Sequence, residues 1–187
     1  MQNIAIISSS VRKERKSHSV ALYFKHYLEE NNLASAEILD LKEYNFPVFE
    51  ETIKTLQNPS EKVLDFAKKI KSADGIIIVT PEYNGGIPAS LKNAIDILYD
   101  EWHGKPISIS TVSSGNFGGS QALVSLQFIL WKIGAWTVTN MFPVSNVEKA
   151  FDENGKALDK VTTDKLAATY IEKLLECVNV NKQTAIV

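Results

Sequence analysis

Short apolar runs rich in β-branched residues alternate along this chain with segments in which apolar residues recur every three or four positions. The runs are typical of buried strands, and the segments between them are typical of helices that pack one face against a sheet. We expect strands over residues 3–8, 36–41, 75–80, 106–111 and 136–144. Because parallel strands need crossover connections, this alternation favours an α/β fold, a parallel sheet with helices on both faces.

The composition excludes several functional classes. The 187 residues carry 20 basic and 22 acidic side chains, a net charge of −2, so we expect neither nucleic acid nor a membrane surface as a partner. Cys177 is the only cysteine, which excludes an internal disulfide and a thiolate-rich metal site, and we expect no bound metal. The N-terminal residues lack the features of a signal peptide, and no apolar run approaches the ~20 residues of a membrane span. We therefore expect a cytoplasmic protein with a single domain over 1–187, in which 178–187 is either ordered or a loose tail.

In an open parallel sheet, ligands bind at the carboxyl ends of the strands where the winding reverses, so the loops after residues 8, 80 and 111 are of most interest. The first loop, "SSSVRKERKSHSV", contains serine hydroxyls and two arginines before a helix that starts near Ser17. A helix start accepts anions, and arginine binds phosphate through charge-assisted hydrogen bonds. The loop matches neither the Walker pattern nor GxGxxG. An alternative is a solvated turn in which Ser17 or Ser19 caps the helix.

The second loop opens the stretch "TPEYNGGIPASLKNAIDIL" at residues 80–98. Its prolines withhold N–H groups, its glycines permit positive φ or close approach, and Tyr83 offers an aromatic ring. This favours a planar ligand with an amide-rich edge, although a rigid strand-to-helix turn is the alternative. The third loop, "SSGNFGGSQ" at 113–121, contains three glycines, which indicates backbone close to a ligand or else a flexible linker.

The segments "PEYNGGIPASLKNAID" and "SGNFGGSQALVSLQFIL" resemble the NAD(P)H-dependent FMN reductases, a flavodoxin-like group that includes quinone, azo-dye and chromate reductases. The resemblance covers about residues 3–145 and implies a doubly wound five-stranded sheet of order 2-1-3-4-5. It also implies an FMN site with three groups of residues. The phosphate group is Ser9, Arg12, Arg15, Ser17, His18 and Ser19, the ring group is Pro81, Glu82, Tyr83, Asn84 and Gly85, and the group on the other side of the ring is Ser114, Gly115 and Gly118. The chain departs from the family in having Ser8-Ser9 where many members have Gly-Ser, and in a longer insertion before Ser17.

The resemblance implies an enzyme that takes hydride from NADPH or NADH and reduces flavins, quinones, azo dyes or other small acceptors through FMN. We assign no catalytic acid or base, because Asp96 lies two turns into a helix, and we expect backbone amides at Asn84 and Gly85 to stabilise the reduced ring. Two alternatives are a flavodoxin-type electron carrier without NAD(P)H turnover and a flavin-free regulatory module on the same fold.

A homodimer, or a dimer of dimers, is also expected, since two helices carry more apolar surface than one buried face requires. The extra apolar residues are Ile97, Tyr99, Trp102, Leu123, Phe128, Leu130 and Trp131. Pairing of these helices across a two-fold axis would place residues of the partner near each flavin, as the family resemblance also implies. The alternative is that these side chains fill the core or lie under the loop 42–58.

Overall fold

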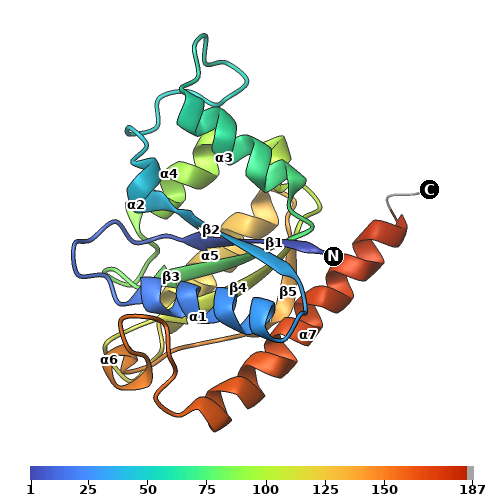
Figure 1. Ribbon diagram of the computed structural model, residues 1–187. Coiled ribbons are helices and arrows are strands. Elements are labelled where there is room, and N and C mark those ends of the chain that lie inside the picture. The colour runs from blue at the N-terminus through green and yellow to red at the C-terminus, as the bar shows by residue number, and fades with distance from the viewer. Residues whose placement is uncertain (185–187) are drawn as a thin grey trace.

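The computed structural model describes residues 1–184, and its centre is a five-stranded parallel sheet (Figure 1). The strands are β1 (Asn3–Ser8), β2 (Ser35–Asp40), β3 (Gly75–Pro81), β4 (Pro106–Val112) and β5 (Trp136–Met141). Their spatial order is β2-β1-β3-β4-β5, which confirms the predicted doubly wound sheet. The fifth strand is shorter than expected, because residues 142–144 follow a register shift and join β4 by separate bonds, such as that from the Val144 N–H to the Thr111 carbonyl, 2.7 Å.

Two layers of helices enclose the sheet (Figure 1). On one face lie α1 (Ser17–Glu30) and α7 (Lys160–Thr184), and on the other lie α3 (Glu61–Ser72), α4 (Ala89–Ile97) and α5 (Ser120–Lys132). Three short elements complete the fold: α2 (Leu41–Tyr44), the 3₁₀ turn η1 (Asp100–Trp102) and α6 (Val147–Ala150). The expected coverage of both faces is therefore present.

The period-two alternation of side chains along a strand divides the core into two clusters. Ile4 and Ile6 of β1 pack with α1 and α7, whereas Ile7 packs with α3 and α4 on the opposite face. Both faces of β1, β3 and β4 are covered, which explains why every central residue of these strands is buried and why β1 and β3 are mostly apolar. The sheet is thus a rigid support for the loops at its carboxyl edge.

The expectation of extra exposed apolar surface is wrong for three residues. Ile97, Trp102 and Leu130 were expected to extend an exposed apolar surface, but all three are buried in the core. The chain bends after α4, so that the Trp102 indole N–H donates to the Ile95 carbonyl, 3.1 Å, and the loop before α3 covers the same region through the Ile53 N–H and the Ile97 carbonyl, 2.8 Å. The alternative of a core role was correct for these residues.

The C-terminal region is helical further than the tail hypothesis allowed. Helix α7 continues to Thr184, and Val178 packs in the core, so residues 178–184 are ordered. The rest of the tail, 185–187, lies outside the described residues. Across 1–184 there is no helix with both the length and the apolar character needed to cross a membrane.

Candidate functional site

The loops that follow β1, β3 and β4 meet at the carboxyl edge of the sheet and enclose a cavity of about 540 Å³. Eight of the residues implied by the resemblance line this cavity: Arg12, Arg15, Ser17, Pro81, Glu82, Tyr83, Ser114 and Gly115. Six others are not part of its wall: Ser9, His18, Ser19, Asn84, Gly85 and Gly118. Val147 and Glu148 of α6 also line it, and sequence reasoning missed them because α6 follows a strand whose loop carries no recognisable motif.

The start of α1 has no capping side chain. The residue before the helix is Lys16, whose side chain does not cap it, and the hydroxyls of Ser9 and Ser17 are buried without a hydrogen-bond partner anywhere in 1–184. The alternative in which Ser17 caps the helix is therefore wrong. Buried hydroxyls without partners are costly, and free N–H groups at a helix start attract anions. A phosphate at this position would accept hydrogen bonds from the buried hydroxyls and from the free N–H groups, so these residues fit the phosphate of FMN.

Arg15 and His18 are organised around Asp40 at the end of β2. The Arg15 guanidinium forms a two-pronged ion pair with Asp40, and the two side chains are only 10% and 12% exposed. His18 Nδ1 lies 3.0 Å from the Ser8 hydroxyl and 3.7 Å from Asp40. Burial lowers the pKa of His18 below 6.5, and the Arg15 cation lowers it further. Through these contacts, Arg15 and His18 hold the first loop in its conformation. Asp40 was not named as a site residue from the sequence, although the predicted strand order places β2 beside β1.

The second loop is a tight hairpin. The Tyr83 N–H donates to the Gly86 carbonyl, 2.9 Å, the reverse bond is 3.1 Å, and the two central residues Asn84 and Gly85 have φ values of 51° and 74°. Positive φ at both central positions is the type I′ turn that Asn-Gly favours. The glycines of this loop were expected from the sequence to permit positive φ, but the φ of Gly86 is not positive. The turn fixes the direction in which Tyr83 leaves β3.

Side chains of the second loop contact both other loops. The Tyr83 and Ser10 hydroxyls are 2.6 Å apart, and the Arg12 guanidinium lies 5.8 Å from the centre of the Tyr83 ring. Glu82 accepts two backbone hydrogen bonds from the start of α5. Asp96, in contrast, pairs with Lys92 on α4 at 2.6 Å, as expected for a structural residue.

The third loop is held on its outer side. The Gly115 carbonyl accepts from the Asn146 N–H at 3.0 Å, and the Gly118 carbonyl accepts from the Thr111 hydroxyl at 2.6 Å. Gly118 has a φ of 60°, and a Cβ there would lie 2.9 Å from Pro143 Cβ. This glycine is thus needed for packing behind the loop. Phe117 lies in the cavity wall and is 86% exposed, a feature that the sequence motif alone did not indicate.

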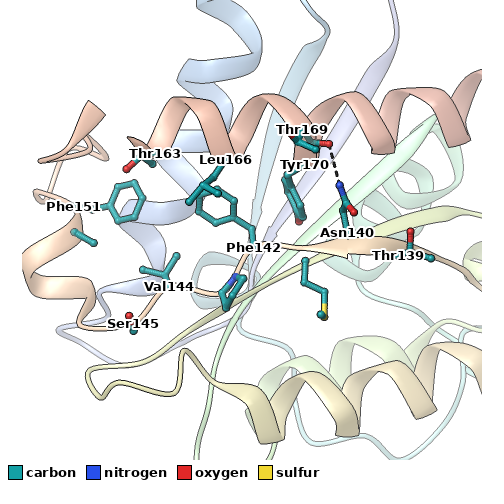
Figure 2. Close-up of a pocket in the computed structure, with 13 residues that line it drawn as sticks. Thr139, Asn140, Phe142, Val144, Ser145, Phe151, Thr163, Leu166, Thr169 and Tyr170 are labelled. Atoms are coloured by element: carbon teal, nitrogen blue, oxygen red, sulfur yellow. Dashed lines mark hydrogen bonds between the residues drawn. The ribbon is translucent and has the colours of Figure 1, made fainter. Parts of the chain in front are cut away.

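A larger cavity of about 690 Å³ lies elsewhere, between β5, α6 and α7 (Figure 2). Figure 2 shows Leu166 and Tyr170 of α7 facing Phe142, with Asn140 bonded to the Thr169 carbonyl at 3.2 Å. Its wall within the described chain carries no charged side chain. We place the site in the smaller cavity because that cavity adjoins the uncapped helix start and contains the arginines. Within 1–184, no group of three or more His, Cys, Asp or Glu side chains is arranged to hold a metal.

Comparison with known proteins identifies the family. The sequence profile of the family described as NADPH-dependent FMN reductase matches residues 2–149. The chain belongs to this family. The resemblance noted over 3–145 is thereby confirmed, together with the enzyme class, an oxidoreductase that uses FMN and a nicotinamide nucleotide.

Individual FMN reductase relatives cover most of the chain. An NAD(P)H-dependent FMN reductase of Saccharomyces cerevisiae is 36% identical over 140 residues, which cover 68% of this chain and 72% of that protein. A quinone reductase of Pseudomonas putida is 30% identical over 189 residues and covers 96% of both chains. Among solved structures, a flavoenzyme NAD(P)H:(acceptor) oxidoreductase from Paracoccus denitrificans superposes with a TM-score of 0.78 at 23% identity, covering 97% of this chain and 99% of that one. At that identity the superposition supports the fold.

Proposed function

We propose that this protein reduces quinones and similar small acceptors with NADPH or NADH, and that FMN binds in the cavity at the carboxyl edge of the sheet. The observation that carries the proposal is the buried, unpartnered hydroxyl of Ser17 at the uncapped start of α1, in the wall of the cavity that also contains Arg12 and Arg15. This arrangement has the donors for one phosphate, and the chain has no second glycine-rich phosphate motif, so FMN is favoured over FAD.

When bound, FMN supplies the redox chemistry between the nicotinamide and the acceptor. The protein itself binds the cofactor and orients it. Ser17 and the first N–H groups of α1 bind the phosphate, with Arg12 adding charge, while Arg15 and His18 keep the first loop in shape through Asp40. Pro81 and Tyr83 form one wall for the ring, with the Asn84-Gly85 turn behind Tyr83, and Ser114 and Gly115 form the other. No side chain acts as a general acid or base in this proposal.

The direct test is anaerobic mixing of the FMN-loaded protein with NADPH and, separately, with NADH. Loss of the yellow absorbance, followed by its return on addition of a quinone, is the expected result. A protein that binds FMN but is not bleached by either nucleotide would instead be an electron carrier. A protein that is colourless after incubation with FMN and removal of the unbound flavin by gel filtration would contradict the proposal entirely. Cofactor released by heat and separated on a column should elute as FMN.

The proposal includes a homodimer formed through the outer face of α5. Phe128 and Trp131 are 63% and 67% exposed, Val124 beside them is also exposed, and the two aromatic rings are 5.8 Å apart. Aromatic side chains are enriched in interface cores, and a lone protomer would leave this group in water. Association of two dimers remains part of the same hypothesis. We also propose a cytoplasmic location, since the free Cys177 and a nicotinamide co-substrate suit a reducing compartment.

A further inference from the structure

The first turn of α5 has no capping side chain of its own. Its N-cap residue is Gly119, with a φ of 78°, and a Cβ at this position would lie 3.0 Å from Thr111 Cβ. A serine, threonine or aspartate, the usual capping residues, is therefore disfavoured here by both the backbone conformation and the available space. The close packing of the third loop thus leaves the helix start in need of an acceptor from another part of the chain.

Glu82 of the second loop supplies that acceptor. Its Oε2 accepts from the N–H of Gln121 at 2.9 Å and from the N–H of Ala122 at 3.2 Å. These are the second and third residues of α5, whose N–H groups a capping side chain ordinarily satisfies. The carboxylate also lies at the positive end of the helix dipole, which stabilises its charge. Glu82 directly follows β3, and its own N–H donates to the Val112 carbonyl at the end of β4, 3.3 Å.

We propose that Glu82 is a positioning residue that sets the separation between the second and third loops, the two walls of the ring-binding slot. The proposal rests on the assignment of FMN to this cavity. The third loop is anchored upstream by the Asn146 contact to Gly115 and in its middle by the Thr111 hydroxyl bond to the Gly118 carbonyl, and at its downstream end it continues into the first turn of α5. Glu82 is the side chain that ties this downstream end to the second loop, so loss of its carboxylate removes that tie while the other two anchors stay.

Hydrogen exchange on the flavin-free protein tests the contact itself. Glu82→Ala removes the acceptor, whereas Glu82→Gln keeps a carbonyl oxygen in the same place without the charge. We expect the amides of Gln121 and Ala122 to exchange about 2-fold to 30-fold faster in Glu82→Ala, the equivalent of one lost cap, and to stay within about threefold of wild type in Glu82→Gln. If Glu82→Ala does not fold, Glu82→Met fills the space without an acceptor. Unchanged exchange at both amides would overturn the proposal, whether or not the protein binds FMN.

Ligand binding tests the consequence. Glu82→Ala should weaken FMN and riboflavin by the same factor, about 2-fold to 30-fold, because the ring slot and not the phosphate site is affected. The matched control is Asp159→Ala, which removes a different helix cap, the acceptor of the Thr162 N–H at 3.1 Å near the start of α7. Exchange should rise near α7 in this control with no change in flavin affinity. Loss of flavin affinity in Glu82→Ala without faster exchange at α5, an equal loss in the control, or an equal loss in Glu82→Gln would each contradict a positioning role.

Discussion

The two arginines of the first loop should respond differently to removal, although both were expected to bind phosphate. Arg12 is exposed, and among the ion pairs formed within 1–184 none involves its guanidinium, whereas Arg15 is almost fully buried against Asp40. Arg12→Ala should leave the free energy of unfolding within about 0.5 kcal/mol of wild type, as for most surface changes. It should weaken FMN by about 1.5–3 kcal/mol, the value of a charged hydrogen bond, or roughly 10-fold to 150-fold. Riboflavin, which has no phosphate, should bind unchanged.

Arg15→Ala should act through stability. Removing one partner of a buried ion pair costs about 3–5 kcal/mol, and we expect about 2–4 kcal/mol here because Asp40 keeps a bond from the Lys42 N–H at 3.0 Å. FMN and riboflavin should then be weakened by similar factors, since the loop as a whole loses its shape. Urea unfolding of the flavin-free variants and fluorescence titration with both flavins measure these quantities. An Arg15→Ala protein of normal stability that loses FMN alone would show that Arg15 leaves Asp40 to bind the phosphate, and would refute the scaffold role.

Three further changes test other parts of the site. Ser17→Ala should leave the flavin-free protein as stable or slightly more stable, because it removes a buried hydroxyl without a partner, yet weaken FMN by roughly 10-fold or more; equal riboflavin loss would contradict this. The lowered pKa of His18 means that the folded state binds fewer protons than the unfolded state, so the free energy of unfolding should fall as pH drops below about 6.5, and less so in His18→Asn. Trp131→Glu should shift sedimentation from dimer to monomer with unchanged far-UV circular dichroism, and a wild-type monomer at micromolar concentration would refute the dimer.

The sheet was predictable because its evidence is local. Strands such as 3–8 and 75–80 have continuous apolar centres, and helices with a single apolar stripe separate them, so the pattern alone indicated a parallel sheet. The Asn84-Gly85 pair is also a short-range signal, typical of a type I′ turn, although at the sequence level only the glycines of this loop were interpreted as allowing positive φ. In both cases the residues that carry the information are neighbours in the sequence.

The roles of Arg15 and Glu82 depended on partners far along the chain, and that of Trp102 depended on where the preceding helix ends. Arg15 meets Asp40 only after β2 has paired with β1, and Glu82 meets α5 across 39 positions. Trp102 extended the apolar surface of a helix in the sequence, but that helix ends at Ile97 and the chain turns inward. The residue types indicated binding or packing roles for these side chains. Which groups they contact is decided by the tertiary structure.

At the uncapped start of α1, the residue that favours FMN binding differs from the residue that would make the flavin-free protein most stable. Lys16 places a positive charge at the positive end of the helix dipole, an arrangement that costs the empty protein stability but suits a helix that awaits an anion. Selection for thermal tolerance alone should therefore favour acidic residues at this exposed position. Lys16→Asp should stabilise the flavin-free chain by about 0.3–1 kcal/mol while repelling the phosphate of FMN. A library of variants at position 16 can be sorted once for stability and once for flavin retention. Acidic residues should be enriched in the first sort and basic residues in the second, because binding sites are often kept at a cost to the stability of the unliganded protein.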